Sequence, residues 1–266
     1  MKIGCCVNMA AADEAGIGID HIETLAKLGY DYVELPIAQM MTLDDTRFNE
    51  LVKRVENSGI KCEAGNNFLK ADLRITGSAT TKPDVLRDYL LQALERASEL
   101  GINSIVFGSS GAKNVPDGFD HKIAWAQIVE FLHVVDELID NRDIYIAIEP
   151  LNRQESNIIQ LASEGLELAK EVNKPHIRLL IDYYHLSAEN EDLTIINEAS
   201  GYLQHMHIAN PVGRTWPKCD DSANYAAFFE MLKRAEYNKR VSIEAFTEDF
   251  EADAERSLKF LRTIIH

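Results

Sequence analysis

The stretch DVLRDYLLQALERASELG (residues 84–101) runs directly into INSIVF (residues 102–107). In the first segment apolar residues recur every three or four positions, which predicts an amphipathic helix, and the second segment is a short apolar strand. Gly101 stands between them and supplies the left-handed residue that closes a helix before the chain reverses. Gly29 and Gly59 occupy the same kind of helix-to-strand junction.

The same alternation of strand and helix continues along the whole chain. Eight segments are predicted as strands: KIGCCV (2–7), DYVEL (31–35), IKCEAG (60–65), INSIVF (102–107), DIYIAIE (143–149), IRLLID (177–182), LQHMHI (203–208) and RVSIE (240–244). Such alternation predicts a parallel sheet with right-handed crossovers, and eight units fit a closed (β/α)8 TIM barrel. An open doubly wound sheet would carry a Gly-rich phosphate loop after an early strand, and none follows the first strand. No linker divides the chain, so residues 1–266 are predicted to form one α/β domain.

Charge and cysteine content exclude several classes of protein. The chain has 27 Lys and Arg against 43 Asp and Glu, a net charge of −16, which repels a phosphate backbone and disfavours nucleic acid as a partner. No stretch approaches the roughly 20 apolar residues of a membrane span. The N-terminal sequence does not read as a signal peptide, and the four cysteines form no CxxC pair. We therefore expect reduced thiols, no membrane partner and a cytoplasmic location.

Four consecutive strands end in side chains that can bind a metal. In a barrel, catalytic groups lie at the carboxyl ends of the strands, and side chains alternate between its two faces. That alternation predicts that these four side chains point into the mouth of the barrel: Glu149, Asp182, His207 and Glu244. Three carboxylates there would repel one another unless a cation lay between them. Oxygen-rich ligands with one nitrogen favour one divalent ion, Mn²⁺ first and Mg²⁺ or Co²⁺ as alternatives.

Four segments resemble a known family. They are IEPLNRQESN (148–157), LLIDYYHL (179–186), HMHIANPVGR (205–214) and SIEAF (242–246). They resemble the sugar phosphate isomerase/epimerase superfamily, whose barrels are similar to xylose isomerase, and within it the D-tagatose 3-epimerase or D-psicose 3-epimerase group. The resemblance extends over the whole chain as eight βα units, and the strand-5 stretch is its most specific part.

The resemblance implies roles for individual residues. It assigns the metal to the same four residues, Glu149, Asp182, His207 and Glu244, and contacts with the substrate to Glu155, His185 and Arg214. The chain departs from the family where the sugar packs. CCVNMA (5–10) and FGSSGAKN (107–114) are small and polar where the family often has aromatic residues, and Ala64-Gly65 replaces a Cys-Gly. We therefore expect this chain to share the metal site of the family but not its sugar specificity.

The activity implied is metal-dependent epimerisation at C3 of a 2-ketose. Removal of the C3 proton gives an ene-diolate, and Glu149 and Glu244 are expected to be the acid/base pair. Alternatives are an aldose–ketose isomerase similar to hydroxypyruvate isomerase and an inosose-type dehydratase. A non-catalytic sugar-binding protein and an endonuclease IV-like enzyme fit less well. The expected partners are a small sugar and further copies of the chain, in a homodimer or homotetramer.

Five other polar or aromatic residues lie near the predicted strand ends or in the loops. His205 points inward one layer below His207 and is expected to be structural. Glu34 and Glu63 are expected either to fill the barrel mouth or to contact substrate. Trp216 is expected to pack at the surface, and Lys113 to be a solvated loop residue.

Overall fold

In the computed structural model, which describes residues 1–265, eight parallel strands pair in chain order and β8 returns to pair with β1. The strands are β1 (Lys2–Cys6), β2 (Tyr32–Pro36), β3 (Lys61–Asn66), β4 (Ser104–Phe107), β5 (Tyr145–Ile148), β6 (Ile177–Asp182), β7 (Leu203–Ile208) and β8 (Arg240–Ile243). Each overlaps a strand predicted from the sequence. The (β/α)8 barrel, a single domain, is confirmed; residue 266 lies outside the described residues.

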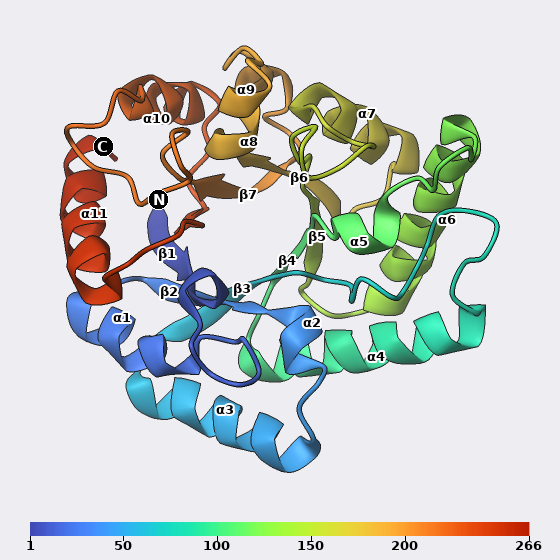
Figure 1. Ribbon diagram of the computed structural model, residues 1–266, viewed down its shortest axis with the longest axis horizontal. Coiled ribbons are helices and arrows are strands. Elements are labelled where there is room, and N and C mark those ends of the chain that lie inside the picture. Colours follow the sequence, from blue (N-terminus) through green and yellow to red (C-terminus); the bar gives the residue numbers. More distant parts are fainter. Residues whose placement is uncertain (266) are drawn as a thin grey trace.

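The strands are enclosed by a ring of helices, which Figure 1 shows around the central barrel. The α-helices are α1 (Ile22–Leu28), α2 (Ile37–Met40), α3 (Asp45–Ser58), α4 (Pro83–Leu100), α5 (Ser110–Lys113), α6 (His121–Ile139), α7 (Ala162–Val172), α8 (Tyr183–Ala188), α9 (Ile195–Glu198), α10 (Tyr225–Arg234) and α11 (Phe250–Ile264). Two short 3₁₀ helices are η1 (Val7–Ala10) and η2 (Ile19–His21). Among the described residues, none of these helices combines the length and apolar character needed to cross a membrane.

Local sequence explains where the main helices begin and end. The Asp44 and Asp120 side chains accept backbone N–H bonds at the starts of α3 and α6, which satisfies donors that the helix cannot pair. Gly59 and Gly101 follow α3 and α4 with φ of 76° and 81°, in the left-handed conformation that ends a helix. The helix-to-strand junctions therefore have the predicted form.

The barrel interior is separate from the large core between strands and helices. Ile3 and Cys5 belong to that outer core, whereas Cys6 points inward toward His207. The adjacent cysteines therefore face opposite sides of β1. A Cβ on Gly4 would overlap the Tyr32 ring, which crosses the interior at this level. The inner layer therefore accommodates an aromatic side chain only because β1 carries Gly there.

An irregularity between β2 and β3 moves Glu63 away from its expected place. Val33 pairs with Cys62, but Glu34 pairs with Ala64, so the pairing skips Glu63. Its carboxylate turns to the amino end of the barrel, where it accepts from Lys2 Nζ at 2.5 Å and Arg240 Nη1 at 3.1 Å. The prediction that Glu63 lies in the mouth was wrong, because alternation alone does not reveal an inserted residue.

Candidate active site

The four metal-capable residues meet in one buried cluster at the carboxyl ends of the strands. Glu149 follows β5, Asp182 ends β6, His207 lies in β7 and Glu244 follows β8. One ligand atom from each lies within 4.8 Å of those of the other three. His207 Nδ1 is 3.0 Å from Glu149 Oε1 and 3.4 Å from Glu244 Oε2. The four inward orientations predicted from strand alternation place these groups together.

The cluster holds more negative charge than its side chains offset. Burial raises the pKa of Asp182 to about 7, although Arg214 opposes the change. Burial and the neighbouring Glu244 raise the pKa of Glu149. Burial would also raise the pKa of Glu244, but Arg214 and His207 hold it well below its ordinary value. Crowded carboxylates of this kind become stable as anions when a cation lies among them.

These residues fit a hard divalent cation. Asp182 Oδ2 is buried and has no hydrogen-bond partner among the described residues, so it is free to bind an ion. Three carboxylates and one imidazole form a donor set rich in oxygen, which suits Mg²⁺ or Mn²⁺ better than a structural zinc site built on thiolates. The buried cluster is thus consistent with a divalent metal site.

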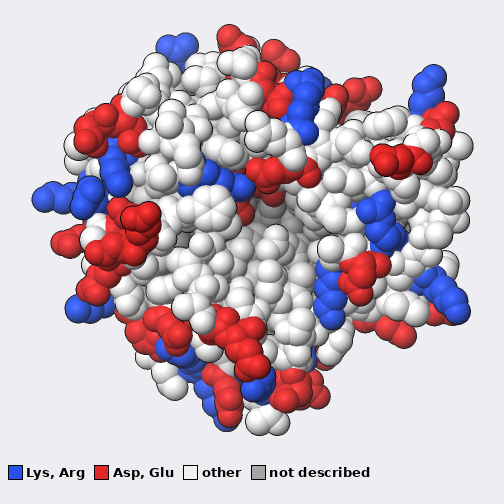
Figure 2. All heavy atoms as spheres, in the orientation of Figure 1, with Lys and Arg blue, Asp and Glu red and all other residues white. Residues whose placement is uncertain are grey.

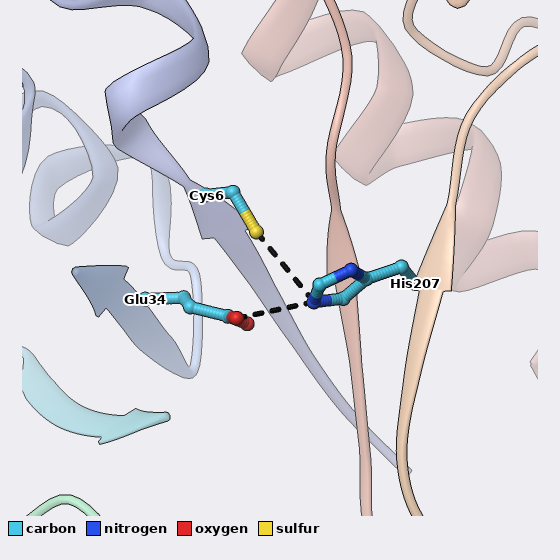
Figure 3. A group of neighbouring side chains, drawn as sticks. All are labelled: Cys6, Glu34 and His207. Atoms are coloured by element: carbon cyan, nitrogen blue, oxygen red, sulfur yellow. Dashed lines mark hydrogen bonds and ion pairs between the residues drawn. The ribbon is translucent and has the colours of Figure 1, made fainter. Parts of the chain in front are cut away.

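Glu34 lies behind His207 and orients its ring. Figure 3 shows Glu34 and Cys6 both directed at His207 Nε2, at 3.1 Å from Glu34 Oε1 and 3.8 Å from Cys6 Sγ. Glu34 Oε2 accepts from Ser242 Oγ at 2.5 Å and lies 2.7 Å from His205 Nε2. Burial would raise the pKa of Glu34, but His207 and His205 hold it well below its ordinary value. The ionised carboxylate favours a proton on His207 Nε2, which leaves Nδ1 as the ligand atom toward the cluster.

His205 has the buried position that was expected. It is fully enclosed, one layer below His207, and its ring lies 6.3 Å from that of Tyr32. Tyr32 Oη in turn is 2.7 Å from Ser242 Oγ. Glu34 therefore belongs to a hydrogen-bonded network in the barrel interior. The alternation of residues along β2 predicted that Glu34 points inward, but it did not identify the residues that Glu34 contacts.

Arg214 and Glu155, implied as substrate contacts, lie next to the cluster. Arg214 Nη1 donates to Glu155 Oε1 at 3.2 Å, and its Nη2 donates to Glu244. The guanidinium carbon lies 4.8 Å from the centre of the Tyr184 ring. The Arg214 backbone has a φ of 50°, in the left-handed region that a non-glycine residue rarely adopts. The loop after β7 is therefore shaped to hold this charge above the carboxylates.

His185 completes the group as a neutral hydrogen-bond donor. Its Nδ1 accepts from the Asn152 backbone N–H at 3.2 Å, which places the ring proton on Nε2. Within residues 1–265, Nε2 has no hydrogen-bond partner, and it lies 3.6 Å from Asp182 Oδ2 and 3.9 Å from Glu155 Oε2. Burial and the nearby Arg214 lower the pKa of His185 to about 3. Asn152 was not singled out from the sequence; its position three residues after Glu149 was the available signal.

Lys113 and Trp216 are buried, contrary to expectation. Lys113 ends the short helix α5, and its Nζ donates to the Glu149 carbonyl oxygen at 3.2 Å. Burial lowers its pKa to about 8, and the nearby Glu149 charge opposes the change. Trp216 is 1% exposed and packs edge-on against Phe250. Both predictions failed because the segments after β4 and β7 pack against the rest of the protein, which covers these side chains.

A cavity of about 350 Å³ opens beside the cluster. Its charged lining residues are Lys70, Glu149, Glu155, Arg214 and Glu244, and its uncharged polar ones include Asn8, Gln39, Asn67, Ser109 and Ser110. Figure 2 shows acidic and basic atoms meeting at the edge of a hollow near the centre of this face, with uncharged residues below it. The cavity therefore combines the carboxylates of the cluster with polar side chains that are mostly uncharged.

Known proteins share this arrangement of strands and helices. D-psicose 3-epimerase of Ruminiclostridium cellulolyticum is 25% identical over 193 residues, which cover 70% of this chain and 64% of that protein, less than two thirds of its length. Ketose 3-epimerase of Arthrobacter globiformis is 24% identical over 99% of this chain and 90% of its own. The solved structure of D-psicose 3-epimerase with D-tagatose, from Clostridium cellulolyticum H10, covers all of both chains with a TM-score of 0.86 at 22% identity.

The family of this chain is assigned by a family model, because the pairwise identities given above are too low to assign it. The model described as "Xylose isomerase-like TIM barrel" matches residues 22–264, nearly the whole chain. The match includes the ends of β5 to β8, where the buried cluster lies. The chain belongs to the xylose isomerase-like TIM barrel family.

Proposed function

We propose that this protein is a divalent-metal-dependent epimerase that inverts C3 of a 2-ketose. The observation that carries the proposal is the pair Glu149 and Glu244. Their carboxylates flank His207 Nδ1 at 3.0 and 3.4 Å within a buried ligand cluster. Both can therefore bind the metal and reach a sugar carbon held beside it. The names of the relatives, ketose and D-psicose 3-epimerases, agree with this activity.

The two carboxylates divide one proton exchange between them. One takes the C3 proton; the C–H electron pair forms a C2–C3 double bond, and the carbonyl electrons move onto O2. The other, in its acid form, donates a proton to the opposite face of C3 and the carbonyl re-forms. A divalent cation bound to Glu149, Asp182, His207 and Glu244 would supply the positive charge that stabilises the ene-diolate. The configuration of the substrate decides which carboxylate abstracts.

The neighbouring residues position the sugar and polarise it. His185 presents a neutral Nε2–H that is unpaired in the part of the chain that the structure describes, which suits donation to a carbonyl oxygen that gains negative charge. Arg214 lies beside Glu244 and Glu155, and can bind a hydroxyl or the developing oxyanion. Glu155 keeps Arg214 in place and can accept from a sugar hydroxyl. The proposal also includes Mn²⁺ as the metal, a cytoplasmic location, and assembly into a dimer or tetramer.

Proton exchange tests the proposal directly. The Mn²⁺-loaded protein is incubated in D₂O with a panel of free and phosphorylated 2-ketoses, and loss of the C1 and C3 proton signals is followed by NMR. Exchange at C3 together with a new epimer is the expected result. The metal-stripped protein is the control, and it should regain exchange when Mn²⁺ is restored.

The same experiment separates the alternatives. Exchange at C1 without exchange at C3 would identify an aldose–ketose isomerase. Loss of water from the substrate would identify a dehydratase, since that reaction begins with the same abstraction. Binding without any exchange would identify a sugar-binding protein and overturn the proposed activity.

A further inference from the structure

Lys113 is a fully buried lysine that the proposed reaction does not use. Its side chain is 0% exposed. Among the described residues, Ser110 and Gly111 of the same short helix line the cavity and Lys113 does not. Within residues 1–265, the one hydrogen-bond partner of Lys113 Nζ is the main-chain oxygen of Glu149, at 3.2 Å. A buried ammonium group with a single neutral acceptor is costly, so its presence beside the reactive cluster indicates a functional role.

The segment that carries Lys113 contacts Glu149 at its N–H, its carboxylate and its carbonyl oxygen. The Glu149 backbone N–H donates to the Phe107 oxygen at 3.1 Å, at the end of β4. A Cβ on Gly108 would overlap Glu149 Oε2, so the carboxylate lies directly against the Gly108 backbone. Lys113 Nζ binds the carbonyl oxygen from the other end of the segment. Residues 107–113 therefore enclose the residue that follows β5.

The Lys113 backbone is itself anchored by the segment that follows β3. Arg74 Nη1 donates to the Gly111 oxygen at 2.6 Å, and Thr76 Oγ1 donates to the Lys113 oxygen at 3.1 Å. The Lys113 side chain then extends over the Phe107 ring, with Nζ 5.7 Å from the ring centre. The ammonium group therefore meets the Glu149 oxygen at a point that is fixed by contacts along the whole length of Lys113.

We propose that Lys113 is a positioning residue, which sets the direction of the Glu149 side chain by holding the main chain at the end of β5. The proposal rests on the proposed function, because Glu149 is there both a metal ligand and one of the two carboxylates that move the proton. Lys113 acts through Glu149 and not on the sugar, since it is enclosed and lies behind the cavity wall. A group that transfers a proton tolerates little displacement, so the loss of this bond should be felt in the reaction.

A metal titration tests the proposal without any sugar. Lys113→Met removes the N–H donors and the charge from a side chain of similar length. Removal of a positive charge near the cluster would by itself tighten Mn²⁺ binding, whereas displacement of Glu149 would weaken it, so the direction of the change separates the two effects. We expect the Mn²⁺ affinity, measured by calorimetric titration, to fall by about 10–100-fold. Lys122→Met, on the exposed surface of α6, is the control and should leave the affinity unchanged.

A second background shows whether the effect passes through the Glu149 side chain. In the Glu149→Gln protein the side chain is only a weak ligand, so adding Lys113→Met should change the Mn²⁺ affinity by less than about threefold. An equal loss in both backgrounds would show a general support of the barrel and would overturn the proposal, as would unchanged or tighter binding in Lys113→Met alone. Lys113→Gln also breaks the bond, because its side chain is shorter, and it gives the same comparison if the Met variant does not fold.

The kinetics of C3 exchange supply the second readout. With saturating Mn²⁺, Lys113→Met should lower kcat by about 10–100-fold and change KM by less than about threefold, because Lys113 contacts the base and not the sugar. A change confined to KM would assign Lys113 to sugar binding and overturn the proposal. If the unchanged protein exchanges no sugar, the proposed function fails, and the two metal titrations still decide whether Lys113 positions Glu149.

Discussion

The two ends of the barrel interior carry buried charge in opposite ways. At the amino end, which we call the floor, one carboxylate, Glu63, faces two cations, Lys2 and Arg240. At the mouth, Arg214 is shared by Glu155, Glu244 and the more distant Asp182. At the floor the buried charges of Glu63 and Arg240 are paired with each other, and the second cation, Lys2, is half exposed to water. At the mouth the charges are not balanced, because the negative groups outnumber the cation that contacts them.

This difference separates a structural charge cluster from a functional one. Burying an ion pair is tolerable when each charge has a partner, as at the floor. Burying like charges together is costly, and it persists where a bound ion or substrate offsets the repulsion. The excess of buried negative charge at the mouth therefore identifies the mouth as the reactive end of this barrel, independently of the family assignment.

The largest effect is expected at the mouth. Glu149→Gln or Glu244→Gln removes a group that must take or give a proton, so the rate of C3 exchange should fall by about 10²–10⁴-fold, measured by NMR with saturating Mn²⁺. Far-UV circular dichroism should show an intact fold in both variants. Retention of most activity by either one would contradict the assignment of that residue to the acid/base pair.

A smaller effect is expected one layer below. Glu34→Gln no longer favours the proton on His207 Nε2, so Mn²⁺ affinity, measured by calorimetric titration, should fall by about 10–100-fold. Tyr32→Phe is the matched control, because it removes only the hydroxyl that contacts Ser242, one step further along the network. Equal losses in the two variants would show that the network acts as a general support of the interior and not through the His207 ring.

A single methyl group should disturb the reactive end without removing any functional group. A Cβ on Gly108 would overlap the Glu149 carboxylate, so Gly108→Ala must displace it. A displacement near 1 Å lowers kcat/KM by up to about 100-fold. A Cβ on Gly201 meets nothing within 4 Å, so Gly201→Ala should keep full activity. A fully active Gly108→Ala protein would mean that the position of Glu149 matters less than proposed.

The smallest effect on activity is expected at the floor. Glu63→Gln leaves Arg240 buried without its carboxylate, which should lower the free energy of unfolding by about 3 kcal/mol. This value is at the low end of the range for breaking a buried ion pair, because the other cation, Lys2, is half exposed. The thermal midpoint should fall by about 5–10 °C in a calorimetric scan. C3 exchange at 25 °C should stay within about twofold, since catalytic groups lie at the opposite end of such barrels. A large loss of exchange would break the distinction between the two ends.

The parts of the site that sequence predicted depend on local rules. The inward directions of Glu149, Asp182, His207 and Glu244 follow from the period of two along a strand, which each segment displays by itself. Consecutive strands of a parallel barrel are neighbours, so these ends had to meet. Alternation and strand order are therefore sufficient to predict the metal cluster, independently of the family resemblance.

The parts that could not be predicted depend on contacts across the barrel or within loops. Glu34 and His207 are 173 residues apart in the sequence, and their contact requires the closed barrel. Lys113 is polar and lies in a Gly-rich stretch, and only the packing of α5 shows that it donates to the Glu149 carbonyl. Glu63 is the residue of β3 that the pairing with β2 skips. Each of these features is set by tertiary geometry that strand periodicity does not contain.

The left-handed backbone at Arg214 has a consequence for protein engineering. A non-glycine residue in that conformation costs about 1–3 kcal/mol, and glycine adopts it without strain. The ion pairs of the guanidinium with Glu155 and Glu244 offset that strain in the folded protein. A library that is screened for heat resistance should therefore hold Arg214 constant, because glycine relieves the backbone strain but leaves the buried carboxylates without their cation.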